Sequence, residues 1–158
     1  MIATEIPEIA IHRTRLALCG LLRPHQTHLH MKKESPAGQK RILNELGGLH
    51  LRHFGLEISL GNSTLSHARQ LALRNVITAS AANLPTRITL DESTHKKRDE
   101  LTIASVLGGN HDVSIRHWPT RNEPLLWIPD AIAWSITRGG QYSAANFGIE
   151  IIPTVRVN

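Results

Sequence analysis

The chain has 158 residues, of which 41% are hydrophobic and 20% are charged. That length predicts one domain, and the composition excludes a disordered chain because it can supply a hydrophobic core. The net charge of +5 favours a polyanionic partner, nucleic acid first, although an ordinary soluble surface explains the same charge equally well.

The N-terminal part of the chain predicts a helix over residues 7–22. Pro7 suits the first turn of a helix, and Ile9, Leu16 and Cys19 lie among its apolar positions. Cys19 is therefore expected to be buried, and as the single cysteine it excludes an internal disulfide. Acidic residues precede the first apolar run, which is not the pattern of a secretory signal.

A strand, a helix and a second strand are predicted next. THLHM, residues 27–31, alternates polar and apolar residues, as strands do. Ser35 is a suitable N-cap and Pro36 suits the first helical position, so a helix follows and ends at the paired glycines of GQKRILNELGGL. LHLRHFGLEISL, residues 49–60, alternates again and predicts the second strand.

The middle of the chain predicts a long helix, LSHARQLALRNVITASAANL. Asn62 or Ser63 can cap it, and Pro85 stops it. Its apolar residues form one stripe along the helix: Leu65, Ala68, Ala72 and Val76.

Two further strands enclose another helix. TRITL, residues 86–90, is a short strand, and DVSIRHW, residues 112–118, is an alternating one. Between them Ser93 or Thr94 can cap the helix HKKRDELTIASVLG.

The last helix is LLWIPDAIAWSI, residues 125–136, with Pro129 near its start. Its two tryptophans are expected in the core, whereas Trp118, which precedes a proline, is expected to be the exposed one. The tail contains GIEIIPTV, a possible edge strand because Pro153 excludes a central one.

Strands and helices therefore alternate, which predicts an α/β fold with a central mixed or largely parallel sheet flanked by helices. We expect one domain over 1–158, made of an N-terminal helix (1–24), a core (25–137) and a tail (138–158). No apolar stretch reaches the roughly 18 residues of a membrane span, so a cytoplasmic protein without membrane contact is expected.

Acidic residues follow the predicted strands, where sites form in open α/β sheets. Glu34 follows THLHM, Asp91 and Glu92 end TRITL, and Asp130 opens the last helix. Carboxylates that converge repel one another unless a cation neutralises them, and Mg²⁺ or Mn²⁺ with phosphate oxygens would do so. Glu34, Asp91 and Asp130 are thus candidate catalytic residues, and together with Glu92 they are candidate metal ligands for phosphodiester cleavage by metal-activated water.

Each acid also has a structural interpretation. Asp130 in a first helical turn interacts well with the helix dipole, and Asp91 and Glu92 suit a turn that starts a helix. Glu34, beside two lysines, would then be a solvated charge. Asp99 would be a surface acid, although it could approach the same sheet edge.

Basic residues adjoin two of the acidic positions and could bind a phosphate backbone. These candidate substrate-binding residues are Lys32, Lys33, Lys96, Lys97 and Arg98. Solvated helix faces explain them nearly as well.

Histidines in HQTHLH give a different candidate. His25, His28 and His30 could bind Zn²⁺, although their spacing matches no zinc signature and partly exposed strand histidines are the alternative. No Walker loop, dinucleotide glycine fingerprint or Gly-x-Ser-x-Gly elbow is present.

Four segments carry a resemblance: LHMKKES, HARQLALRNVI, ITLDESTHKKRDEL and PLLWIPDAIAWSI. Over residues 15–137 the chain resembles an uncharacterised bacterial family of small RNase H-like proteins, common in actinobacteria. The resemblance implies an RNase H-like fold and a metal-dependent nuclease, with ligands at Glu34, Asp91 and Asp130 and support from Glu92 or Asp99.

The chain departs from that family at its N-terminus. Relatives begin with a strand that carries a leading Asp, whereas TEIPEIAIHRTRLAL predicts a helix with no acid at a strand centre or end. A truncated chain, a degenerate site and a site completed by a partner are the alternatives. The leading hypothesis is an RNase H-like nuclease acting on nucleic acid; its rivals are a non-catalytic binding or assembly module of that fold and a histidine-based metal protein.

Overall fold

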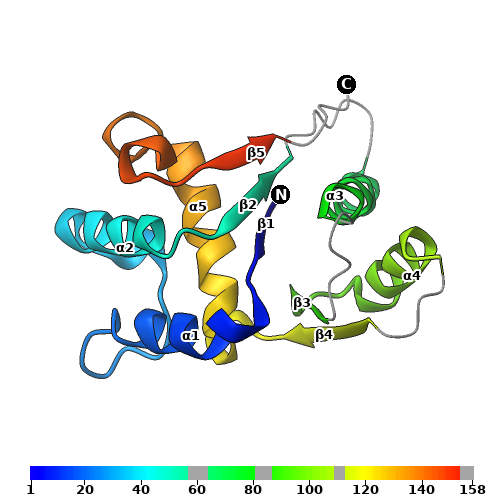
Figure 1. Cartoon of the computed structure of the whole chain (residues 1–158), viewed down its shortest axis with the longest axis horizontal. Helices are drawn as coiled ribbons and strands as arrows, with labels where there is room; N and C mark the ends of the chain where they lie inside the picture. Colours follow the sequence, from blue (N-terminus) through cyan, green and yellow to red (C-terminus); the bar gives the residue numbers. More distant parts are fainter. Residues whose placement is uncertain (57–63, 81–86, 109–112, 154–158) are drawn as a thin grey trace. The chain divides into compact units, whose positions relative to one another are not determined.

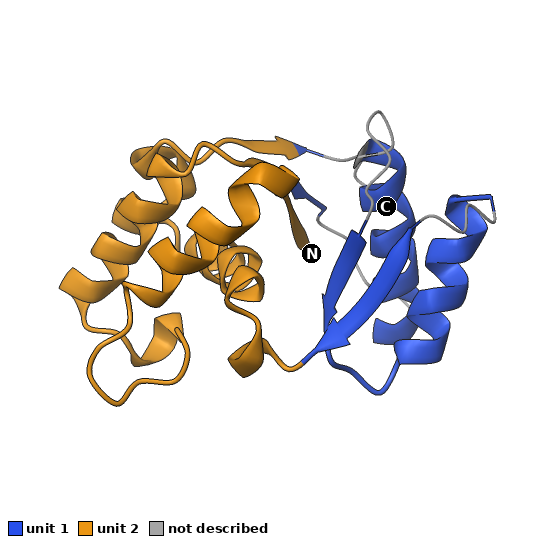
Figure 2. Cartoon of the chain, turned by 60° about the horizontal axis from the view of Figure 1, so that its bottom comes forward, with its two compact units in different colours: residues 1, 54–118, 153–158 blue, residues 2–53, 119–152 orange. Residues whose placement is uncertain are grey.

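The structure, a computed structural model, describes four segments of the chain: 1–56, 64–80, 87–108 and 113–153. The chain divides into two compact units (Figure 2). Unit 1 comprises residues 1, 54–118 and 153–158, and unit 2 comprises residues 2–53 and 119–152. The prediction of a single domain stays a prediction. No described helix is both long and apolar enough to cross a membrane.

Unit 2 contains three α-helices (Figure 1): α1 (Ile11–Cys19), α2 (Pro36–Gly48) and α5 (Trp127–Arg138). A three-stranded sheet has the order β1 (Ile2–Glu5), β2 (Arg52–Gly55), β5 (Ile151–Pro153). Short 3-10 turns join these elements: η1 (Glu8–Ala10), η2 (Met31–Lys33), η3 (Thr120–Asn122), η4 (Pro124–Leu126), η5 (Gly140–Tyr142) and η6 (Ala144–Phe147). β5 lies at the edge of the sheet, which confirms the prediction made from Pro153.

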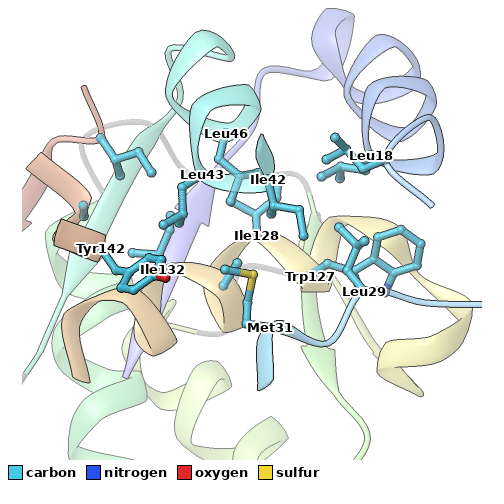
Figure 3. Close-up of a cluster of buried hydrophobic side chains, with 14 residues drawn as sticks. Leu18, Leu29, Met31, Ile42, Leu43, Leu46, Trp127, Ile128, Ile132 and Tyr142 are labelled. Atoms are coloured by element: carbon cyan, nitrogen blue, oxygen red, sulfur yellow. The ribbon is translucent and has the colours of Figure 1, made fainter. Parts of the chain in front are cut away.

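The core of unit 2 lies among its three helices, as Figure 3 shows. Its most deeply buried side chains, each at most 1% exposed, are Leu18, Ile42, Leu43, Leu46, Ile128 and Ile132. Trp127 is also buried, and Trp134 packs edge-on against Tyr142 with ring centroids 5.3 Å apart. The apolar run of α5 is therefore a core-facing helix, as the sequence predicted.

Local sequence signals determine how α2 begins. Ser35 is its N-cap and accepts a hydrogen bond from the Gly38 N–H at 3.2 Å, while Pro36 occupies the first helical position, where its missing N–H costs nothing. Both features were predicted. At the other end Gly47 is buried directly against the backbone of Phe147 in η6.

The N-terminal prediction was wrong in two respects. β1 precedes the helix, so residues 1–24 are not simply helical, and α1 is shorter than predicted. The expected apolar stripe also faces solvent, because Ile9 is 95% and Leu16 61% exposed and Cys19 is exposed as well. A different side of this short helix, the one that carries Thr14 and Leu18, faces the core and is buried.

The predicted strand at 27–31 is also absent. Turns lead through this segment into η2, and the Gln39 side-chain amide donates to the Met31 carbonyl at 2.8 Å. Leu29 and Met31 are both buried. The alternation thus marks which side chains reach the core, and it does not indicate pairing with another strand.

Unit 1 contains α3 (Leu65–Ser80), β3 (Arg87–Asp91), α4 (Lys96–Val106) and β4 (Ser114–Trp118). β3 and β4 pair in parallel across α4, which makes a β-α-β unit as predicted. Within α3 three of the four stripe residues, Ala68, Ala72 and Val76, are buried, whereas Leu65 is 75% exposed. The predicted caps Asn62 and Ser63, and Pro85, lie outside the described residues.

These elements confirm the α/β class. The described strands form two separate sheets, one of three strands and one parallel pair, where a single central sheet was predicted.

Candidate functional site

Two acids stand at the carboxyl end of the parallel pair in unit 1. Asp91 is the last residue of β3 and lies opposite Trp118, the last residue of β4. The Glu92 N–H donates to the Trp118 carbonyl at 2.9 Å, so the pairing holds the chain in place where the acids emerge. Both acidic residues are exposed. The sequence predicted this placement correctly.

Three cations follow them at the start of α4. Lys96, Lys97 and Arg98 are exposed, and Arg98 donates to the Ser66 hydroxyl. Cations in a first helical turn face the positive end of the helix dipole, and the one acid in that turn, Asp99, is buried and paired with Arg69, so it does not offset the exposed cations. The predicted substrate-binding residues of unit 1 therefore lie where a phosphate group would lower the electrostatic energy.

Asp99 is a structural acid, and its prediction as a surface residue was wrong. Its side chain is fully buried and accepts hydrogen bonds from Arg69 Nε and Nη2, at 2.8 Å in the shortest case. Ser93 also lies 3.5 Å from one carboxylate oxygen. The pair joins α3 to α4, and the guanidinium already neutralises the charge that a metal ion would need.

His117 is a buried group that the sequence analysis missed. Its side chain is 2% exposed, and neither ring nitrogen has a hydrogen-bond partner among the described residues. The Glu100 carboxylate lies 3.9 Å away, too far for a hydrogen bond. Glu100 belongs to α4, so this contact shows which face of β4 the helix covers.

Glu34 is a second acid held by an arginine. Its side chain is only 6% exposed, accepts a hydrogen bond from Gln26 Nε2 at 2.6 Å and pairs with Arg23 at 3.3 Å. The alternative of a solvated charge was therefore wrong. Its carboxylate ties residues 23–26 to the start of α2, while the neighbouring Lys32 and Lys33 are exposed.

The histidine segment shows no metal cluster. His28 accepts or donates a hydrogen bond with Thr27 at 3.0 Å, and His25 has a left-handed backbone at φ 67°. Across the described parts of the chain, no three His, Cys, Asp or Glu side chains gather as a metal site would require.

Asp130 lies in the first turn of α5, directly after Pro129. It is exposed, and no hydrogen bond or ion pair joins its carboxylate to another described residue. This position fits the favourable interaction with the helix dipole that was one of its two interpretations.

Unit 2 also contains two groups with shifted pKa values, neither found from the sequence. Hydrogen bonds from Arg15 to the Glu123 carboxylate, at 2.7 and 3.1 Å, raise the pKa of the guanidinium. Burial lowers the pKa of His53 to about 4, and its Nδ1 atom lies 3.0 Å from the Thr4 hydroxyl.

The first strand brings a further acid. β1 ends at Glu5, which pairs with Arg52 of β2 at 3.1 Å. An acid therefore does stand at the end of the leading strand, contrary to the prediction of a helix without one.

The predicted carboxylates belong to different units. Asp91 and Glu92 are in unit 1, whereas Glu34 and Asp130 are in unit 2. Their convergence on one cation therefore stays a prediction. No family model, curated protein or solved structure matches this chain, so its function has to be argued from its own residues.

Proposed function

We propose that this chain is an RNase H-like α/β protein that acts on nucleic acid and is related to divalent-metal-dependent nucleases. The observation that carries this proposal is the carboxyl end of the parallel pair in unit 1. Exposed Asp91 and Glu92 there immediately precede the exposed cations Lys96 and Lys97. Acids at such a strand end suit a hard cation, and adjoining lysines suit a phosphodiester.

The resemblance to RNase H-like proteins is supported by two features of the fold. A β-α-β unit with parallel strands is present, and the chain begins with a strand that ends on an acid, Glu5. Glu5 is paired with Arg52, however, so its charge is already neutralised and is not available to a metal ion.

Within the described segments, no three His, Cys, Asp or Glu side chains form a complete metal site. Of the proposed ligands, Glu34 is already bound by Arg23 and Gln26. Among the proposed ligands, Asp91 and Glu92 are both exposed and both belong to unit 1, and these two carboxylates are the ones that we propose for Mg²⁺ or Mn²⁺ there; Asp130, in unit 2, is exposed as well.

The test is cleavage of labelled DNA and RNA oligonucleotides with Mn²⁺, with Mg²⁺ and with EDTA. Asp91→Ala should lower the metal-dependent rate at least about 100-fold, because it removes a charge that the cation requires, and Asp130→Ala tests separately whether the carboxylate of unit 2 takes part. Glu8→Ala removes an equally exposed carboxylate from η1 and should leave the rate unchanged. Wild-type rates in both aspartate variants would eliminate the nuclease proposal.

A non-catalytic binding or assembly module of the same fold is the second candidate. It is favoured by the arginine partners of Glu34 and Asp99, which leave fewer acids for a metal. It predicts that neither Mg²⁺ nor Mn²⁺ raises the melting temperature, whereas a cation bound only by the native state must raise it.

A further inference from the structure

The parallel pair in unit 1 has two faces of different character. Along β4 exposed and half-buried residues alternate, because successive side chains of a strand point to opposite faces. Ile115 and His117 point to one face, together with Ile88 and Leu90 of β3, which lie opposite them in the register.

That first face is covered by helix α4. His117 is 2% exposed there, and its ring lies against Glu100 of α4. It is therefore the core side of the β-α-β unit, and the second face points away from α4.

The second face presents cations and one aromatic ring. Register pairs place its side chains in three rows: Arg87 with Ser114, Thr89 with Arg116, and Asp91 with Trp118. Trp118 is 41% exposed, and Arg87 and Arg116 are exposed too. No hydrogen bond or ion pair connects the side chain of either arginine to another described residue.

Such a face is unusual for a parallel pair. Parallel strands are normally covered on both sides by apolar packing, whereas this face carries exposed arginines and a partly exposed tryptophan. A partner on this face must suit an aromatic ring with one guanidinium group, of Arg116, in the next row and a second, of Arg87, one row further along the same face. A nucleic acid base stacks on any aromatic face, and its phosphate pairs with arginine.

We propose that this open face binds single-stranded nucleic acid, with Trp118 stacking on a base and Arg116 and Arg87 contacting the phosphates. Bases of a duplex are paired and stacked, so only an unpaired base can lie on the ring. Five residues of strand span about 13 Å at ~3.3 Å each, which accommodates roughly two nucleotides.

The inference deepens the proposed function, because it names the substrate class, but binding itself does not require cleavage. Asp91 lies beside Trp118 on the same face and repels phosphates. The backbone of the bound strand therefore follows the two arginines, and it approaches Asp91 closely only when a cation is present.

The experiment measures binding of fluorescent 12-nucleotide single strands, DNA and RNA, and of the matching duplexes, by anisotropy in EDTA. Trp118→Ala should weaken single-strand binding by roughly 5- to 150-fold, the range for loss of one stacked base, and Trp118→Phe should retain most of it. Arg116→Ala should weaken binding and lower its salt dependence. Arg74→Ala removes an exposed cation from α3 in the same unit and should change binding less than about twofold.

Two results would overturn the inference: wild-type affinity in both Trp118→Ala and Arg116→Ala, or duplexes bound as tightly as single strands. Circular dichroism shows whether each variant is folded. If Trp118→Ala does not fold, Arg116→Ala still tests the inference. Neither of these results decides the nuclease proposal, which the cleavage assay tests separately. Mn²⁺-dependent cleavage that is lost in Asp130→Ala would support that proposal whatever the open face binds.

Discussion

Helix α2 and the turn η6 lie so close together that one added methyl group between them should measurably lower the free energy of unfolding. A Cβ atom at Gly47 would lie 1.8 Å from the Phe147 carbonyl oxygen, whereas real Cβ atoms essentially never come closer than 3.0 Å. The two backbones would have to separate by at least the difference, 1.2 Å. Gly48, the next residue, has nothing within 4 Å of the same position.

We therefore expect Gly47→Ala to destabilise the protein by about 3 kcal/mol, the upper part of the usual range for overpacking, because backbone atoms cannot move aside as a side chain can. Gly48→Ala should be neutral or up to about 1 kcal/mol stabilising, since alanine favours a helix over glycine. For a chain of this length, a loss of 3 kcal/mol lowers the melting temperature by roughly 6 to 12 °C.

The assay is urea unfolding followed by tryptophan fluorescence, with thermal unfolding by circular dichroism as a second measurement. Trp127 and Trp134 lie in or against the same core and report on it directly. Equal stability of the two alanine variants would refute the close approach of α2 and η6, because the two substitutions differ only in what surrounds the added methyl group.

Two more predictions concern buried charges. The folded pKa of His53, about 4, lies below its ordinary value of 6.5, so the stability that the neutral ring provides is complete above pH 6.5 and is lost as the pH falls from 6.5 through 4. That loss, at most about 3 kcal/mol in urea unfolding, should disappear in His53→Asn, which can keep the contact with Thr4 but does not titrate; an unchanged pH dependence would contradict this. Arg69→Met should cost about 3 to 5 kcal/mol by the same assay, because it leaves the Asp99 carboxylate buried and unpaired. Arg74→Ala, on the exposed side of the same helix, should stay within about 0.5 kcal/mol of wild type, and an equal effect of both would show that the pair is not important.

Local signals predicted much of the fold. Ser35 followed by Pro36 located the start of α2, the alternation of residues 112–118 located β4, and the proline after Trp118 indicated that this tryptophan is exposed. Each signal acts through neighbours within a few residues, so no tertiary information is needed. The same reasoning gave a wrong result for the N-terminal helix. In so short a segment apolar residues lie on more than one side, and only contact with the rest of the core determines which side is buried.

The candidate site could be predicted only in part, since partners distant in the chain decide the state of each acid. Asp91 and Asp130 were placed correctly, at a strand end and in a first helical turn. Glu34 and Asp99 have equally polar surroundings in the sequence, yet an arginine 11 residues away holds the first and one 30 residues away holds the second. Nothing in either local segment indicates this pairing.

Burial therefore separates two kinds of acid that the sequence treats alike. A carboxylate that is enclosed and bound by a guanidinium contributes to stability only as long as that partner stays, and its charge is not available to a second cation. Asp91 and Asp130 are exposed and contribute little to packing, and the first-turn position of Asp130 suits the helix dipole. We therefore expect substitutions of Arg69 and Asp99 to change the free energy of unfolding, and substitutions of Asp91 and Trp118 to change ligand binding. Neither pair of substitutions should have the effect of the other.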